Sequence, residues 1–138
     1  KRRIIYAVDE IYGVKMSNRD FAKKLHEKDY ASERIAADSA EPKSIAQLKS
    51  ELNIPKVYGA KKGPDSVEFG EQWLADLVAI VIDPLRTPNT AREFENIDYA
   101  TDKDGNVIPR LMDKDNHTID STRYALEEDM KKPSFSFD

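Results

Sequence analysis

Apolar and polar positions recur along the chain with two different periods, and the change from one period to the other predicts the elements. Short apolar runs bounded by turn residues predict strands, whereas apolar residues at every third or fourth position predict helices. The predicted strands are residues 3–12, 34–37, 56–60 and 79–83, and the predicted helices are residues 17–28, 44–52, 65–77, 90–96 and 116–132. Strands that alternate with helices indicate an α/β layer with a mixed or parallel sheet.

Capping and turn residues fix some of these boundaries. Ser17 is a plausible N-cap for the helix predicted at residues 17–28, and Asn116 is a plausible N-cap for the last helix. Gly105 lies between two short apolar runs, Tyr99–Thr101 and Val107–Ile108, and glycine supplies the positive φ that a hairpin turn needs. The sequence therefore predicts a small β-hairpin before the C-terminal helix.

The length and composition fit one globular domain, predicted at residues 1–132 and followed by a loose tail at 133–138. Apolar residues make up 39% of the chain and charged residues 35%. No window approaches the apolar length of a membrane span, and the N-terminal apolar run is too short for a secretion signal. The net charge of −4 argues against a protein that simply coats nucleic acid, although it does not exclude a nuclease.

Two segments far apart in the sequence carry the candidate chemistry. The apolar run before Asp38 predicts a strand that ends in a carboxylate, and His117 and Asp120 lie one turn apart at the start of the last helix. Carboxylates and an imidazole can together hold divalent cations. Since the chain contains no cysteine, the ligands must be oxygen and imidazole, which fits magnesium or manganese better than structural zinc.

Three segments in order resemble the C-terminal nuclease domain of the large terminase subunit of tailed bacteriophages: Ile35–Ser44, Lys61–Val67 and Asn116–Ala125. The resemblance covers about Arg3 to Glu128. It implies an RNase H-like fold, in which helices flank a mixed sheet. It also implies a metal-dependent endonuclease that cuts concatemeric double-stranded DNA by two-metal phosphodiester hydrolysis, with Mg²⁺ or Mn²⁺ as the cofactor.

The same resemblance implies the partners and the setting of the protein. They are double-stranded DNA, an upstream ATPase domain in a longer polypeptide, the small terminase subunit and the portal of the procapsid, with no membrane. The setting is the cytoplasm of the infected bacterial host. No Gly-x-x-x-x-Gly-Lys-Ser/Thr sequence occurs in the chain, so the ATP-hydrolysing translocase is expected upstream.

By motif, Asp38 corresponds to the family's metal-binding aspartate, and His117 to the histidine that closes the metal site in part of the family. Asp120 is either a further ligand or a partner that orients the imidazole. Three lysines, Lys43 and the pair Lys61 and Lys62, are candidates for contacts with the DNA backbone.

Each of these residues also has a simpler structural interpretation. Asp38 alone could cap the turn before the next helix, and a histidine at a helix start is usually a surface or capping residue. Glu41 is either a second metal acid or, as we favour, an early-turn residue that the helix dipole stabilises. Lysines in loops are ordinarily solvated, and we expect Arg123 to make a structural salt bridge.

The chain departs from the family pattern at one position. The family's first strand carries an essential aspartate, whereas the opening of this chain resembles the second strand, so the domain is expected to be N-terminally incomplete. We do not assign the role of that missing metal ligand to Asp9. The endonuclease is the leading hypothesis, and this departure is the best support for the runner-up, a non-catalytic module with a nuclease-like fold that docks on DNA or the portal. A third hypothesis is another RNase H-like enzyme, such as a resolvase.

Overall fold

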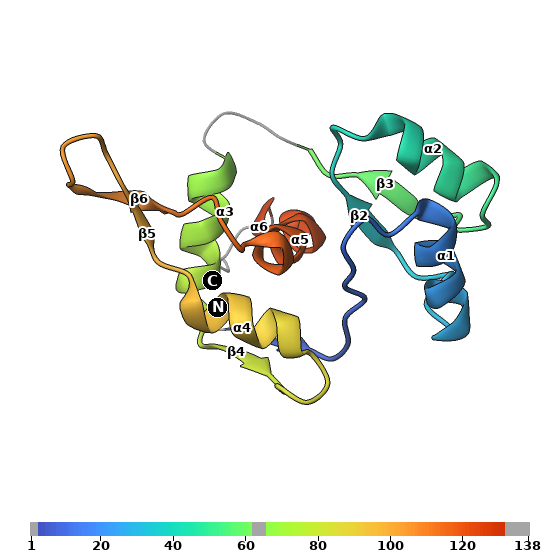
Figure 1. Cartoon of the computed structure of the whole chain (residues 1–138), viewed down its shortest axis with the longest axis horizontal. Helices are drawn as coiled ribbons and strands as arrows, with labels where there is room; N and C mark the ends of the chain where they lie inside the picture. Colours follow the sequence, from blue (N-terminus) through green and yellow to red (C-terminus); the bar gives the residue numbers. More distant parts are fainter. Residues whose placement is uncertain (1–2, 62–65, 132–138) are drawn as a thin grey trace, which may run out of the picture. The chain divides into compact units, whose positions relative to one another are not determined.

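The structure is a computed structural model that describes residues 3–61 and 66–131, and within them the chain forms six helices and six strands. These residues divide into two compact units (Figure 1). The inserted unit comprises residues 11–61, and the main unit comprises residues 3–10 and 66–131. The predicted tail at 133–138 lies outside the described residues.

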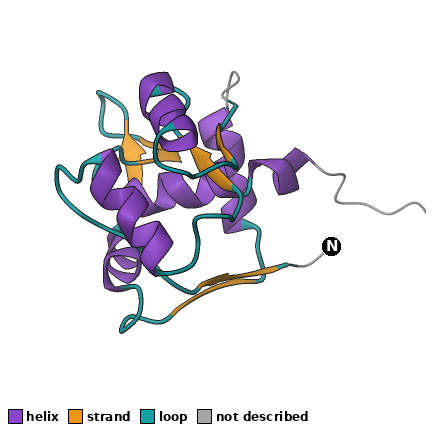
Figure 2. Cartoon of the chain, turned by 90° about the vertical axis from the view of Figure 1, so that its right-hand side faces the viewer, coloured by secondary structure: helices purple, strands orange, loops and turns teal. Residues whose placement is uncertain are grey.

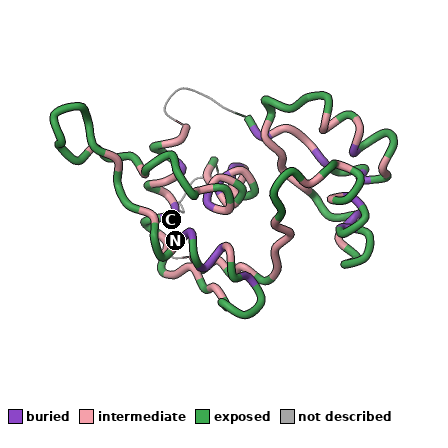
Figure 3. Tube along the Cα trace, viewed as in Figure 1, coloured by how far each residue is buried: buried purple, intermediate pink, exposed green. Residues whose placement is uncertain are grey.

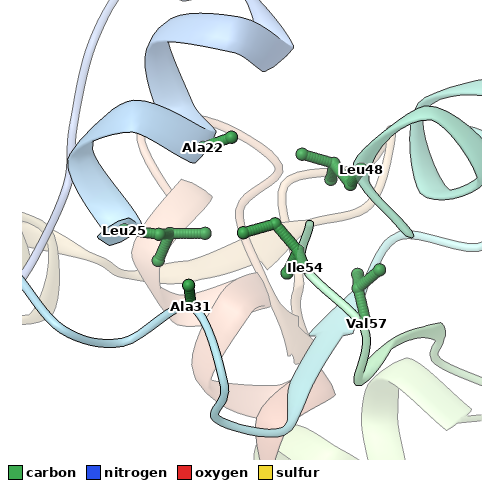
Figure 4. Close-up of a cluster of buried hydrophobic side chains, with 6 residues drawn as sticks. All are labelled: Ala22, Leu25, Ala31, Leu48, Ile54 and Val57. Carbon is green, nitrogen blue, oxygen red and sulfur yellow. The ribbon is translucent and has the colours of Figure 1, made fainter. Parts of the chain in front are cut away.

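The inserted unit consists of two helices and a pair of parallel strands. Its elements are α1 (Asn18–Glu27), β2 (Ile35–Ala37), α2 (Pro42–Ser50) and β3 (Val57–Gly59). Ile35 pairs with Val57 and Ala37 with Gly59, so β2 and β3 run in the same direction. Its core contains six buried apolar side chains from α1, α2, β3 and the loops that precede β2 and β3 (Figure 4): Ala22, Leu25, Ala31, Leu48, Ile54 and Val57.

The two helices of this unit begin with favourable residues. Ser17 is the N-cap of α1, as predicted, and its hydroxyl accepts a hydrogen bond of 3.0 Å from the backbone N–H of Asp20. Helix α2 begins at Pro42, two residues before its predicted start. Proline suits the first position of a helix because its missing N–H would be unpaired there in any case.

The main unit contains the other pair of parallel strands, a hairpin and four helices. Its elements are β1 (Ile4–Ala7), α3 (Ser66–Ala75), β4 (Ala79–Ile82), α4 (Pro88–Asn96), β5 (Tyr99–Thr101), β6 (Val107–Leu111), α5 (His117–Ala125) and α6 (Glu127–Lys131). Strands β1 and β4 run side by side near the N-terminal end (Figure 2). In this parallel pair Ile4 lies opposite Ala79 and Ala7 opposite Ile82. None of the helices in the described ranges is long and apolar enough to cross a membrane.

The hairpin of β5 and β6 has the predicted turn. Gly105 adopts a φ of +85°, and its N–H donates to the carbonyl of Asp102 at 3.0 Å. One carboxylate oxygen of Asp102 accepts the N–H groups of Asp104 and Asn106, each at 2.9 Å. The N–H of Asn106 is the main cause that lowers the pKa of Asp102. Desolvation opposes it, and the N–H of Asp104 lowers the pKa further. The turn itself is exposed (Figure 3).

Two further predictions about the elements were wrong in extent. Strand β1 ends at Ala7 rather than at Tyr12, since Ala7 pairs with Ile82, the last residue of β4, and Pro84 follows two residues later. The C-terminal helix is two helices, since Leu126 (φ −102°, ψ 7°) leaves the helical region between α5 and α6. Among the described residues the strands form three two-stranded sheets, of which two are parallel and one is antiparallel.

A carboxylate distant in sequence caps helix α4. One oxygen of Glu10 accepts the backbone N–H (3.1 Å) and side-chain amide (2.7 Å) of Asn89. The other accepts the backbone N–H (2.8 Å) and hydroxyl (2.7 Å) of Thr90. The residue at the N-cap position, Thr87, makes no side-chain capping bond within the described chain. Glu10 therefore performs the N-cap function for α4 and fixes the segment after β1 to this helix.

We expect Glu10→Gln to lower the free energy of unfolding by about 1–2 kcal/mol at neutral pH. Desolvation acts to raise the pKa of Glu10, but the hydrogen bonds from Thr90 and Asn89 outweigh it and bring the pKa below 4.5. A carboxyl group whose pKa is lower in the folded state stabilises the fold above its unfolded pKa, and this stabilisation is lost as the pH falls through the folded value.

Urea unfolding of wild type and Glu10→Gln from pH 7 to pH 3 measures this effect. The difference between the two proteins should be constant near neutral pH and should shrink below about pH 4.5. Glu95→Gln, which changes an exposed glutamate on the same helix, is the matched control and should leave stability unchanged. A Glu10→Gln deficit that stays the same at every pH would show that the charge of Glu10 does not stabilise α4.

Candidate metal centre

Asp38 directly follows β2, as predicted, and it also closes a turn. Its Oδ1 accepts the backbone N–H of Ala40 at 3.0 Å, and its carbonyl accepts the N–H of Glu41 at 3.2 Å. Asp38 therefore does cap the turn before α2, as its simpler structural interpretation predicts. This capping role does not exclude metal ligation, because an ionised carboxylate offers about four lone-pair positions. Asp38 is half-buried.

Glu41 and two of the three candidate lysines lie near the same end of the β2–β3 pair. Glu41 is the N-cap residue of α2, is exposed and makes no side-chain capping bond within the described chain. Pairing continues past the strands, since the N–H of Ala60 donates to Ala37 at 2.8 Å, and Asp38 and Lys61 both follow this point. Lys43 is exposed in the first turn of α2, Lys61 is also exposed, and Lys62 lies outside the described residues.

Helix α5 carries the other two predicted ligands. His117 is its first residue and is exposed, whereas Asp120 is half-buried one turn later on the same helix face. The inward face of the helix is fixed by Ile119, which is 2% exposed. The helix thus turns an imidazole and a carboxylate in similar directions while its apolar side packs in the main unit.

Asn116 occupies the N-cap position of α5, as predicted, but its side chain makes no capping bond to a described residue. A glutamate of α4 takes this role instead. Oε1 of Glu93 accepts the backbone N–H of Thr118 at 2.6 Å and the Thr118 hydroxyl at 2.7 Å. Glu93 is not among the residues predicted from the sequence, because nothing in the sequence distinguishes it from the exposed Glu95 on the same helix.

Arg123 makes the predicted structural salt bridge, and its partner is Asp120. Nη2 of Arg123 lies 3.1 Å from Oδ1 of Asp120, and the guanidinium carbon lies 5.1 Å from the ring centre of Tyr124. The Arg123 side chain is only 10% exposed, and its Nε has no hydrogen-bond partner among the described residues. The pair orients one candidate ligand from within its own helix.

Gly70 of α3 makes room for Arg123. A Cβ at position 70 would lie 2.5 Å from Cδ and 2.6 Å from Cγ of the arginine. We expect Gly70→Ala to cost about 1–3 kcal/mol of stability, because the crowded side chain must move and the gain in helix propensity only partly offsets this. Thermal unfolding measures the change, and a stability equal to or above that of wild type would contradict the close packing of α3 against α5.

The chemistry of these side chains fits a hard divalent cation. They supply carboxylate oxygen and imidazole nitrogen, which are ligands for Mg²⁺ and Mn²⁺. Within residues 3–61 and 66–131, no three His, Asp or Glu side chains form a group that could hold a metal ion. Asp38 belongs to the inserted unit, and His117 and Asp120 belong to the main unit. That all three share cations therefore stays a prediction.

Comparison with known proteins places the chain in a family. The terminase RNase H-like domain model matches residues 1–128. The terminase large subunit of Bacillus phage SPP1 is 62% identical over 136 residues, which cover 99% of this chain and 32% of that protein. The PBSX phage terminase large subunit of Bacillus subtilis is 32% identical over 137 residues, which cover 96% of this chain and 31% of that protein. The chain thus spans about a third of the length of these curated relatives.

A solved structure is similar over most of the chain. It is the crystal structure of the nuclease domain of the g2p large terminase from bacteriophage SPP1 with bound Mn, at 63% identity and a TM-score of 0.89. The match covers 91% of this chain and 71% of that one, and it confirms the predicted RNase H-like α/β fold. With the family match over residues 1–128, these similarities show that the chain belongs to the terminase RNase H-like domain family.

Proposed function

We propose that this chain is the metal-dependent endonuclease domain of a phage DNA-packaging terminase, which cuts concatemeric double-stranded DNA. The observation that carries the proposal is the similarity, at 63% identity, to a terminase nuclease domain that was crystallised with bound Mn. The structural likeness covers 91% of the chain, and the family model matches residues 1–128, a range that contains Asp38 and His117. The family match over residues 1–128 also supports a single nuclease domain at residues 1–132.

The proposed cofactor is Mg²⁺ or Mn²⁺, held by Asp38, His117 and Asp120. Two such ions, when bound, would supply an activated water and charge neutralisation at the leaving 3′ oxygen. Asp38 is suited to this site because a strand end holds its carboxylate in place, and the turn bond from Ala40 limits its rotation. His117 and Asp120 present their ligand atoms from one face of α5. Arg123 restrains the Asp120 carboxylate at 3.1 Å.

DNA is proposed to bind through its phosphates, with little sequence preference. The candidate contacts are Lys43, Lys61 and Lys62, of which Lys43 and Lys61 are exposed. Because the net charge of the chain is −4, binding should be weak and should depend on local positive charge. The binding constant should therefore fall steeply as the salt concentration rises.

The other partners belong to the whole protein. The curated relatives are about three times as long as this chain, and they are large terminase subunits. We propose that the whole protein also contains an upstream ATPase domain, and that it acts with the small terminase subunit and the portal of the procapsid. Its proposed location is the cytoplasm of the infected bacterial host.

Incubation of the purified chain with supercoiled plasmid tests the proposed function. With Mn²⁺ or Mg²⁺ we expect nicked and then linear plasmid, and with EDTA we expect the plasmid to remain supercoiled. Retarded plasmid without any cut product would contradict the proposal and favour a DNA-docking module. A strong preference for branched over linear duplex would favour a resolvase instead.

A further inference from the structure

A buried carboxylate of α4 holds the first turn of the helix that carries His117. The Glu93 side chain is 0% exposed, and its Oε1 lies 2.6 Å from the backbone nitrogen of Thr118 and 2.7 Å from the Thr118 hydroxyl. Bonds of this length are typical of charge-assisted hydrogen bonds. Thr118 is the residue after His117, so Glu93 holds the backbone from which the imidazole extends.

The N-cap residue of α5 makes no capping hydrogen bond to a residue that the structure describes, so the helix start depends more on Glu93. Asn116 donates from its side-chain nitrogen to Asp113 at 3.3 Å, and it makes no capping bond to the N–H groups of α5 among the described residues. The first helical bond of α5 is from the N–H of Asp120 to the carbonyl of Asn116, at 2.9 Å. The earlier N–H groups need a partner from outside the helix, and Glu93 supplies one for Thr118.

The same contact opposes rotation of α5 about its axis. Ile119, at 2% exposed, anchors the inward face of the helix, and Arg123 packs against Gly70 one turn further on. Glu93 adds a third fixed point, at the end where His117 lies. A metal ligand must be held to within about half an ångström of its productive position, and exposed side chains reach that precision only through a fixed backbone.

From these contacts we infer that Glu93 is a positioning residue for the metal site, an inference that rests on the proposed function. Glu93 does not touch the cation. It fixes the helix start before the metal binds. The entropic cost of ordering the turn that carries His117 and Asp120 therefore does not reduce the free energy of metal binding. Residues that orient metal ligands in this way typically change metal affinity by about 10–100-fold when they are replaced.

Isothermal titration of Mn²⁺ into the metal-free chain tests the inference without any nuclease reaction. The variants are Glu93→Ala, Glu93→Gln and His117→Ala. The matched control is Glu71→Ala, because Glu71 also accepts a backbone N–H, that of Leu111 at 2.9 Å, but holds β6 rather than α5. Circular dichroism and thermal unfolding of each variant report folding and stability.

We expect Glu93→Ala to weaken Mn²⁺ binding by about 10–100-fold. Glu93→Gln should recover most of the affinity, because its amide oxygen can still accept from Thr118. Glu71→Ala should lose stability but keep the affinity of wild type. A purely structural role for Glu93 predicts instead that affinity falls in parallel with thermal stability in all the glutamate variants, and this result would overturn the inference.

Two further outcomes separate this inference from the function on which it rests. Wild-type affinity in folded Glu93→Ala, together with lost binding in His117→Ala, would overturn the role of Glu93 alone. Unchanged binding in His117→Ala would overturn the proposed metal site and, with it, the role of Glu93. If Glu93→Ala does not fold, Glu93→Gln decides by NMR. The Thr118 amide proton should move upfield relative to wild type as its charge-assisted bond weakens, and an unmoved signal would overturn the inference.

Discussion

Replacement of Asp38 by asparagine is expected to lower the manganese-supported rate of plasmid nicking by about 10²–10³-fold. Asparagine keeps an oxygen that can accept the Ala40 N–H, so the turn after β2 should survive. The substitution removes the negative charge that a bridging metal ligand supplies, and the cations depend on that charge. The measurement is the initial nicking rate of supercoiled plasmid at saturating Mn²⁺.

Asp83 provides a closely matched control. It also follows a short strand of a parallel pair, and its Oδ1 accepts the N–H of Leu85 at 2.9 Å, as Asp38 accepts that of Ala40 at 3.0 Å. Asp83→Asn therefore makes the same local change at a strand end outside the terminase motifs, and it should cut plasmid like wild type. Equal rates for wild type, Asp38→Asn and Asp83→Asn would show that Asp38 is only a turn residue.

Replacement of His117 by alanine is expected to lower the nicking rate by roughly two orders of magnitude. The loss should be larger with Mn²⁺ than with Mg²⁺, because imidazole is a better ligand for manganese than for magnesium. The substitution should change stability little, since His117 is exposed and α5 is held by Glu93 and Ile119. The measurement is the nicking rate of wild type and of His117→Ala, each in Mn²⁺ and in Mg²⁺, with one preparation of each protein.

The second histidine of the chain serves as the control. His26 is exposed on α1, and its Nε2 lies 3.0 Å from the carbonyl of Leu52. His26→Ala removes an imidazole from the surface of the inserted unit and should leave both metal-dependent rates unchanged. If His117→Ala also leaves them unchanged, the histidine is a helix-start surface residue and not part of a metal site.

Local signals in the sequence predicted much of the fold. The Ser17 cap, the Gly105 turn and the paired runs on either side of it depend on neighbours within a few residues, and they are where they were expected. Strand β1 was predicted too long, because its end depends on where its distant partner β4 ends. The position of each predicted ligand on its element was also a local property, since it depends only on residue order and helical spacing.

The glutamates that cap helices α4 and α5 could not be predicted from local signals. Glu10 and Glu93 each cap a helix distant in the sequence, and neither follows the capping pattern of a residue just before the helix. In the sequence Glu93 resembles any other glutamate of a polar helix, and only the packing of α4 beside α5 buries it. Asn116 had the residue type and position of an N-cap, and yet Glu93 makes the bond instead.

We predict that Asp38 and His117 bind the same pair of cations, and anomalous diffraction from crystals soaked in Mn²⁺ tests this most directly. We expect two manganese peaks about 3.5–4 Å apart, with the Asp38 carboxylate and the His117 imidazole among their ligands. Peaks that contact only one of these side chains, or no peaks near either, would contradict the claim.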